Sequence, residues 1–345
     1  MKYEVTIGIP VYNVKKHIRQ TLDSAMAQTF PSIEYLICDD CGTDGSMDVV
    51  HEYQQSHPRG KDIRIVRQPH NMGIGNARNR LIGEAQGKYL FFLDADDTIS
   101  SNAIELLNRT AMEYNAEFVY ASYERIEVID ENQKQSIACC YPLLYFSEKN
   151  EFANYVYLKY DNIQAPVWNI LMSLEVLRKN NIRFEPVNYW EDFAVSIDLP
   201  TYVTRVVLLP NVTYHYYCRG GSLSHFQERT IIYKNEIEQT INLINQLKWN
   251  VNRIKNEDYF PMRMYKVMMT EFYIVCTILR NEHIISPSFT NDEIRDIIKS
   301  PMTLNEILHF RQARLPNLLL FVLSKLTPMV SVFVMRVIGK IRGLI

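Results

Sequence analysis

The first hundred residues alternate short apolar runs with segments of helical periodicity, and no other feature of the chain constrains its fold as strongly. Four apolar runs predict strands, at residues 5–9, 33–38, 63–67 and 89–93. The segments between them, such as 18–26, repeat apolar residues at the spacing of one helix face. Strands that alternate with helices form βαβ units. We therefore predict an α/β fold with a mostly parallel central sheet flanked by helices.

The composition excludes several other classes of protein. Hydrophobic residues make up 47% of the 345 residues and charged residues 22%, which excludes a disordered or collagen-like chain. With 37 basic and 39 acidic residues, the chain is too balanced in charge for a general nucleic-acid binder, so we expect no nucleic acid among its partners. The six cysteines lack the spacing of a disulfide framework or a zinc site, and no signal peptide precedes the first strand. Together these features indicate a cytoplasmic protein.

The C-terminal segment 315–345 is apolar and basic. After Glu306 the chain has no acidic residue but six basic ones: Arg311, Arg314, Lys325, Arg336, Lys340 and Arg342. Lys325 and Pro328 interrupt the apolar run, whereas a transmembrane helix needs about 20 consecutive apolar residues. Two alternatives remain: a pair of terminal helices packed on the body of the protein, or helices that lie in the interface of an anionic membrane.

Polar residues follow three of the predicted strands, at 10–13, 39–40 and 94–97. Open α/β sheets bind ligands at this edge, where the carboxyl ends of the strands meet. Asp94 and Asp96 form a D-x-D motif, which suits a hard divalent cation that also takes oxygens from a phosphate. Acidic turns are common after strands, but a cluster of carboxylates at the end of a buried strand is costly without a cation. The pattern therefore favours a bound Mn²⁺ or Mg²⁺.

Two further side chains near this edge each have two interpretations. The Asp40 carboxylate could accept a hydrogen bond from a base N–H, such as that of uracil, or it could start the turn before Gly42 or cap the following helix. Arg78 follows a glycine-containing turn that opens a helix, so it could contact a diphosphate. The alternative interpretation is that Arg78 lies on the solvated face of that helix.

Several blocks of this sequence resemble, in the right order, the inverting family 2 glycosyltransferases of GT-A fold. The nucleotide-binding blocks are T-I-G-I-P-V-Y-N at 6–13, Q-T-F and E-Y-L-I at 28–37, D-D-C-G-T-D-G-S at 39–46, N-M-G at 71–73, A-R-N at 77–79, G-K-Y at 87–89 and the D-x-D. The blocks of the acceptor half are V-W-N at 167–169, I-R-F at 182–184, E-D at 191–192 and the segment 214–224. Two departures stand out. Cys41-Gly42 replaces the usual Gly-Ser, and Tyr217 takes the place of an arginine, which leaves Arg219 for the diphosphate.

The resemblance implies roles for individual residues. The implied donor-binding residues are Pro10, Tyr12, Asp39, Asp40, Arg78, Asp94, Ala95 and Arg219. Among them, Asp40 would accept from the uracil N–H, and Asp94 would bind the ribose or a metal-bound water. Asp96, with Asp94, would hold Mn²⁺ or Mg²⁺. Asp192 would be the general base, with Glu191 as the reserve candidate, and Tyr189 and Trp190 could stack on an acceptor sugar or belong to the core.

The resemblance also implies an activity. It would be the metal-dependent transfer of a sugar, with inversion, from a nucleotide-sugar such as a UDP-sugar to a hydroxyl of a glycan or lipid-linked acceptor in bacterial cell-surface polysaccharide synthesis. Such an enzyme would lie in the cytoplasm or on the cytoplasmic face of the inner membrane. We expect a GT-A domain at 1–225, with a nucleotide-binding half at 1–115 and an acceptor half at 116–225, followed by a helical region at 226–314 and the tail.

Two other functions are weighed against this one. A catalytically inactive module that binds sugar nucleotides would not need the intact D-x-D and the Glu191-Asp192 pair. A dinucleotide-dependent oxidoreductase is suggested by Gly73-Ile74-Gly75, but the third glycine of that motif is missing, and the turn after the first strand has no glycine.

Overall fold

The computed structural model describes residues 2–128, 134–159, 166–187, 190–218 and 230–345. The chain divides into two compact units. The first comprises Met1–Phe152 and Gln164–His225, and the second comprises Ala153–Ile163 and Phe226–Ile345. The finer division into a nucleotide-binding half and an acceptor half stays a prediction.

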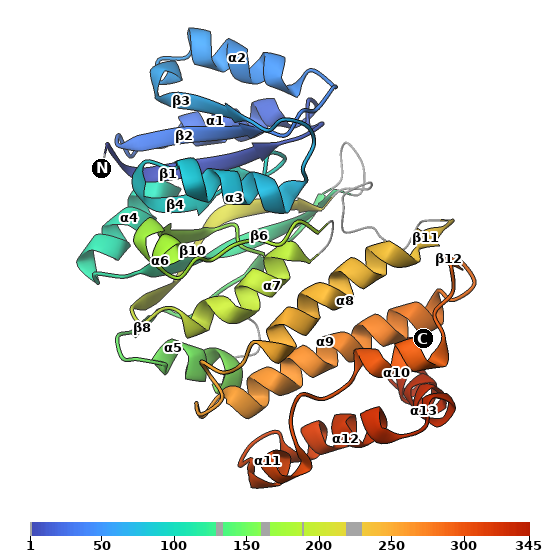
Figure 1. The fold of residues 1–345 in the computed structure, drawn as a ribbon. Coiled ribbons are helices and arrows are strands. Elements are labelled where there is room, and N and C mark those ends of the chain that lie inside the picture. Colours follow the sequence, from blue (N-terminus) through green and yellow to red (C-terminus); the bar gives the residue numbers. More distant parts are fainter. Residues whose placement is uncertain (1, 129–133, 160–165, 188–189, 219–229) are drawn as a thin grey trace. The chain divides into compact units, whose positions relative to one another are not determined.

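Among the described residues, ten strands form one mixed sheet in the first unit (Figure 1). They are β1 (Tyr3–Val11), β2 (Ile33–Asp39), β3 (Ile63–Arg67), β4 (Gly87–Phe92), β5 (Thr98–Ile99), β6 (Phe118–Val128), β7 (Lys134–Cys139), β8 (Leu144–Phe146), β9 (Ile170–Ser173) and β10 (Val206–Cys218). The order is β3-β2-β1-β4-β9-β6-β10-β5, with β7 beside β6 and β8 beside β10. The α/β fold and the four strands predicted in the first hundred residues are confirmed.

The strands β3, β2, β1 and β4 are parallel neighbours. In their register Val11 pairs with Asp39, and Gly8 pairs with Phe92. The polar residues that follow β1, β2 and β4 therefore lie at the same edge of the sheet, as predicted. All seven residues of β2 are buried, which is expected of a parallel strand covered on both faces.

Helices connect these strands. In the first unit they are α1 (Ile18–Met26), α2 (Ser46–Ser56), α3 (Ile74–Glu84), α4 (Ala103–Glu113), α6 (Leu174–Lys179) and α7 (Glu191–Asp198), with short 3₁₀ turns η1 (Gly60–Asp62) and η3 (Leu199–Thr201). The boundary between the two units falls within α5 (Glu151–Asn154). α1 forms because Ile18, Leu22 and Ala25 fall on one face, and it buries that face against the sheet. Helices α3 and α6 contact each other and lie over β1 and β4 (Figure 1).

One strand in the middle of the sheet runs against the direction of β4. β9 pairs antiparallel with both β4 and β6 and thus joins the four parallel strands to the parallel pair β6 and β10. Hydrophobic periodicity reports which faces of a strand are buried, and it carries no information on strand direction. The sequence therefore could not predict this orientation.

The second unit is mostly helical, as expected for 226–314. It contains a π-helical turn η2 (Tyr155–Lys159), the short strands β11 (Ile232–Tyr233) and β12 (Ile285–Ser286), and the helices α8 (Lys234–Trp249), α9 (Phe260–Arg280), α10 (Asn291–Ile297), α11 (Leu304–His309), α12 (Arg314–Lys325) and α13 (Pro328–Ile341). The apolar stripe of α9, which includes Met264, Met268 and Phe272, is buried as core packing. Beside it Lys248 and Glu271 form a fully buried ion pair of 2.7 Å, and burial raises the pKa of Glu271 to about 7.

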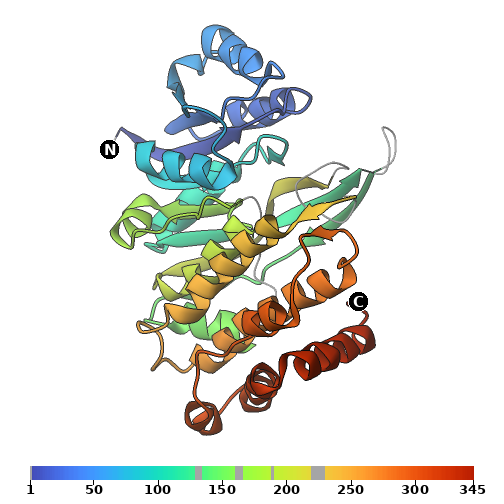
Figure 2. The same ribbon diagram turned by 45° about the vertical axis from the view of Figure 1, so that its right-hand side comes forward.

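The basic C-terminal segment forms two helices of the second unit, α12 and α13, separated at Lys325 and Pro328 as the sequence predicts. Both helices pack on α9, and α13 also packs on α10 (Figure 2). In the part of the chain that the structure describes, no helix is both long enough and apolar enough to cross a membrane.

Candidate active site

The turns after β1 and β2 are bound to each other at the carboxyl edge of the sheet. The Asn13 Oδ1 atom accepts a hydrogen bond from the Thr43 backbone N–H at 2.8 Å, and the Ser46 hydroxyl accepts from the Val14 N–H at 2.8 Å. Gly42 is required here, because a Cβ atom at that position would lie 2.8 Å from the Asn13 nitrogen. These bonds hold the exposed Tyr12 ring and the buried Pro10 beside the end of β2.

Cys41, one of the two departures from the family pattern, adopts a left-handed conformation with φ of 61°. A glycine takes this conformation freely, whereas a residue with a Cβ pays about 1–2 kcal/mol. The Cys41 thiol donates to the Gln68 carbonyl at 3.1 Å, and the Cys41 N–H donates to the Asp39 carboxylate at 2.9 Å. The substitution therefore preserves the turn that presents Asp39 and Asp40.

The Asp40 carboxylate is buried and accepts two backbone hydrogen bonds from the turn before α3. The Met72 N–H donates to Oδ1 at 2.8 Å, and the Gly73 N–H donates to Oδ2 at 2.9 Å. Burial raises the pKa of Asp40, and these two bonds oppose the rise. Asp40 therefore neither starts the turn before Gly42 nor caps the following helix. Its carboxylate instead anchors the turn before α3, about Met72, which lies 32 residues further along the chain.

Arg78 lies at the centre of the site and joins three separate segments of the chain. Its guanidinium is buried, with Nη1 2.7 Å from Glu191 Oε1 and Nη2 3.2 Å from Asp94 Oδ1. The rings of Phe92 and Phe184 lie within 6.0 Å of it. The alternative of a solvated helix face is therefore wrong. Within the described residues the buried Arg78 Nε has no hydrogen-bond partner.

Glu191 and Asp192 form the first turn of α7, which follows Trp190 in a left-handed conformation. Glu191 is buried and bound to Arg78; burial raises its pKa to about 7, although the guanidinium opposes the rise. Asp192 is half-buried, and its Oδ1 accepts from the Phe193 N–H at 2.7 Å. Burial also raises the pKa of Asp192. Both candidate bases thus lie next to the arginine that contacts Asp94.

Asp97 and Tyr214 hold the D-x-D turn in place, and the sequence analysis missed this pair as site residues. The Tyr214 hydroxyl donates to Asp97 Oδ2 at 2.8 Å and accepts from the Asp94 N–H at 3.2 Å, while the Tyr217 N–H donates to Asp97 Oδ1 at 2.9 Å. Burial, together with Asp96 and Asp94, raises the pKa of Asp97 to about 8. The sequence signals were that Asp97 ends the polar run 94–97 and that Tyr214 begins the last block of the family resemblance.

Tyr214→Phe is expected to lower the free energy of unfolding by about 1–3 kcal/mol, because Asp97 would lose a buried hydrogen-bond donor. It should also lower kcat/KM, because the Asp94 backbone would lose its anchor. The matched control is Tyr89→Phe, which removes a buried hydrogen bond of 3.0 Å to the Ala116 carbonyl at the middle of the sheet. Urea denaturation and kinetics of both variants provide the measurement. If both variants lose stability equally and neither loses activity, Tyr214 has no positioning role.

The donor set at the D-x-D turn fits a divalent cation. Asp94 and Asp96 are half-exposed at the end of β4, Ala95 between them is buried, and Asp97 lies beneath. Burial is the main cause of the raised pKa of Asp97, and the neighbouring carboxylates Asp96 and Asp94, whose charge a cation would offset, add to the rise. Within the described ranges no group of three or more His, Cys, Asp and Glu side chains forms a complete metal site. Phosphate oxygens of a bound nucleotide would have to complete the coordination.

Two predicted residues fall outside this arrangement. Arg219 and Tyr189 lie outside the described residues. Trp190 is 40% exposed with its ring 5.6 Å from that of Phe193, so it does not belong to the core.

The sheet is mixed, its D-x-D turn lies at the carboxyl end of a parallel strand, and this turn is bridged by Arg78 to the acidic first turn of α7. These features define an α/β enzyme of GT-A-like fold. The sequence model described as "Glycosyl transferase family 2" matches residues 6–179. The chain belongs to this family and is a glycosyltransferase.

Two curated relatives cover most of the chain. Cholesterol galactosyltransferase of Borreliella burgdorferi is 26% identical over 280 residues, 79% of this chain and 74% of that protein. The Escherichia coli enzyme named UDP-Glc:alpha-D-GlcNAc-diphosphoundecaprenol beta-1,3-glucosyltransferase WfaP is 27% identical over 243 residues, 69% of this chain and 87% of that protein. The chain spans only 31% and 46% of the length of two others among the first relatives that it matches.

Two solved structures share the fold. TarS 1-349 of S. aureus, in complex with UDP-GlcNAc, superimposes with a TM-score of 0.66 at 16% identity and covers 93% of this chain and 90% of that chain. The mannosyltransferase PcManGT of Pyrobaculum calidifontis, in complex with GDP-Man and Mn²⁺, gives a TM-score of 0.54 at 14% identity and covers 98% of this chain and 88% of that chain.

Proposed function

We propose that this glycosyltransferase is a metal-dependent, inverting enzyme that transfers a sugar from a UDP-sugar to a hydroxyl of a glycan or lipid-linked acceptor in bacterial cell-surface polysaccharide synthesis. The observation that carries the proposal is the Arg78 bridge between Asp94 and Glu191. This bridge brings the candidate metal ligands of the D-x-D next to the candidate bases of α7. A donor held at the D-x-D would therefore present its anomeric carbon near a carboxylate.

Asp96 and Asp94 would hold the cation. A bound Mn²⁺ or Mg²⁺ neutralises the negative charge that develops on the departing nucleotide diphosphate. Arg78, whose guanidinium lies beside Asp94, would add positive charge next to the same phosphates. Asp40 would contact the base through a remaining lone pair of its carboxylate, beside Tyr12 and Pro10.

Asp192 is favoured over Glu191 as the general base. An alcohol becomes a competent nucleophile only when a base takes its proton during attack. Glu191 is bound to Arg78 through an ion pair of 2.7 Å, which occupies the carboxylate and fixes its direction. Asp192 is more exposed, so an acceptor hydroxyl can reach it. A single general base supports a single displacement, which inverts the anomeric centre.

The nature of the donor and acceptor rests on the relatives. The name of the Escherichia coli relative describes transfer from UDP-Glc onto a diphosphoundecaprenol-linked sugar, which supports a UDP-sugar donor and a lipid-linked acceptor. No particular sugar is proposed, because the site residues do not select one and the names of the relatives differ in the sugar.

The test is a screen of nucleotide-sugars for metal-dependent release of the nucleoside diphosphate. UDP-glucose, UDP-galactose, their N-acetyl forms and GDP-mannose would be compared with Mn²⁺ and with EDTA. We expect one UDP-sugar to be hydrolysed slowly with Mn²⁺ and not with EDTA. Thermal stabilisation by UDP and Mn²⁺ without release of UDP, even with acceptors present, would instead identify an inactive binding module. Stabilisation by NAD alone would identify a dinucleotide enzyme.

A further inference from the structure

Helices α12 and α13 form an outer layer of the second unit (Figures 1 and 2). Their buried and exposed faces are both apolar. Their inner side chains, such as Leu320, Leu323 and Met335, are buried in the unit. The exposed apolar side chains are Leu315, Leu319 and Val322 on α12, and Met329, Val330, Phe333, Val337 and Ile341 on α13. We call these eight side chains the apolar face.

The side chains of the apolar face are regularly spaced along α13 and strongly exposed. Met329, Phe333, Val337 and Ile341 recur every four residues and therefore share one side of α13. Leu315 is 75% exposed, Met329 74% and Ile341 80%. Isolated apolar side chains are normal on a protein surface, but eight of them on two helices that contact each other mark an interaction site.

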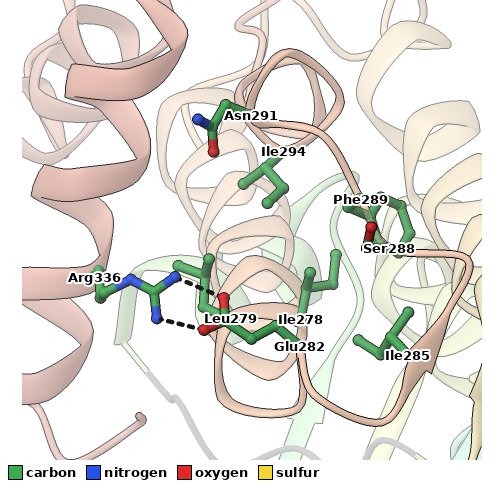
Figure 3. Close-up of a pocket in the computed structure, with 9 residues that line it drawn as sticks. All are labelled: Ile278, Leu279, Glu282, Ile285, Ser288, Phe289, Asn291, Ile294 and Arg336. Atoms are coloured by element: carbon green, nitrogen blue, oxygen red, sulfur yellow. Dashed lines mark hydrogen bonds and ion pairs between the residues drawn. The ribbon is translucent and has the colours of Figure 1, made fainter.

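The charged residues of α12 and α13 are all basic. Lys325, Lys340 and Arg342 are exposed, and none has an acidic partner among the residues that the structure describes. Arg336 differs, because its guanidinium lies 2.7 Å from the carboxylate of Glu282, in the turn that follows α9, beside a cavity of about 280 Å³ (Figure 3). Lys325, Lys340 and Arg342 are thus available to a partner, together with the exposed Arg311 and Arg314 at the start of α12.

The charge decides what kind of partner fits. A second copy of the chain would bring the same cations against one another, and like charges that meet in an interface oppose association. An anionic bilayer offers the complementary charge together with an apolar layer for the exposed side chains. Helices that lie in a membrane interface combine an apolar side with lysine and arginine in this way.

We propose that α12 and α13 form a docking face for an anionic lipid bilayer. The apolar face enters the headgroup boundary, and Lys325, Lys340 and Arg342 contact lipid phosphates. This attachment is peripheral and does not depend on the proposed reaction.

The first test is sedimentation of the full-length protein with vesicles. Equimolar phosphatidylglycerol and phosphatidylcholine are compared with phosphatidylcholine alone, at low and at high salt. We expect binding to the anionic vesicles at low salt, and weaker binding at high salt because salt screens the cations. If the protein does not sediment with anionic vesicles at low salt, the proposal is overturned.

The charge variant is Lys325→Glu/Lys340→Glu/Arg342→Glu, which should weaken partitioning on the order of 10²-fold or more. The control Lys61→Glu/Arg109→Glu/Lys179→Glu changes the net charge equally at exposed positions of the first unit and should keep most of the binding. Equal loss in both variants would show a response to net charge alone and would refute a docking face.

The apolar variant is Met329→Gln/Phe333→Ser, which should also weaken partitioning, with Met112→Gln on α4 as the exposed control. Unchanged partitioning of this variant contradicts seating of the apolar face. A concentration-dependent dimer that the same substitutions abolish, without lipid binding, would assign the face to a second copy.

Metal-dependent hydrolysis of the UDP-sugar should be unchanged in all variants. Vesicle binding without any such hydrolysis would count against the proposed reaction and leave the docking face standing.

Discussion

Asp192→Asn is expected to lower kcat by roughly 10²–10⁴-fold, while the affinity for UDP in the presence of Mn²⁺ stays nearly unchanged. The amide has the shape of the carboxylate but cannot accept the acceptor proton. Its oxygen can still accept the Phe193 N–H, so the first turn of α7 should persist. Steady-state transfer kinetics and calorimetric titration with UDP provide the two measurements.

Two variants serve as controls for this prediction. Asp198→Asn makes the same chemical change in the last turn of α7 and should leave kcat unaffected. Glu191→Gln removes the charge that Arg78 binds, so we expect lower stability and altered donor binding in addition to any loss of rate. If Glu191→Gln is inactive with normal donor binding and Asp192→Asn is active, the two carboxylates have the opposite roles.

Asp96→Asn is expected to reduce transfer on the order of 10²-fold or more with the fold intact, because it removes an anionic metal ligand without a change of shape. EDTA should have a comparable effect on the unmodified enzyme. Isothermal titration with Mn²⁺ and UDP gives an independent measure, since the variant should bind UDP with a smaller dependence on the metal. The control is Asp292→Asn, an exposed aspartate of α10. Full activity of Asp96→Asn, or of the enzyme in EDTA, would refute the assignment of the D-x-D.

The sequence predicted the local elements of the first unit well. Strand β3 has the predicted ends, residues 63 and 67, and the helical stripe at 18–26 is buried as expected. Such elements follow from periodicity within ten or so residues, which decides which side chains can be buried together. The same local reasoning placed Asp40 and Asp94 at the carboxyl edge, because consecutive parallel strands bring their ends together.

The partners of these residues were decided only by the tertiary structure. Arg78 and Glu191 are 113 residues apart, and Tyr214 and Asp97 are 117 residues apart. Their contacts depend on the antiparallel insertion of β9 and on the path of β10, neither of which leaves a local pattern in the sequence. The charge of the C-terminal segment was readable from composition, but its exposed apolar face was not. A helix buries whichever side its neighbours cover, and those neighbours are defined by packing between segments that are distant in the chain.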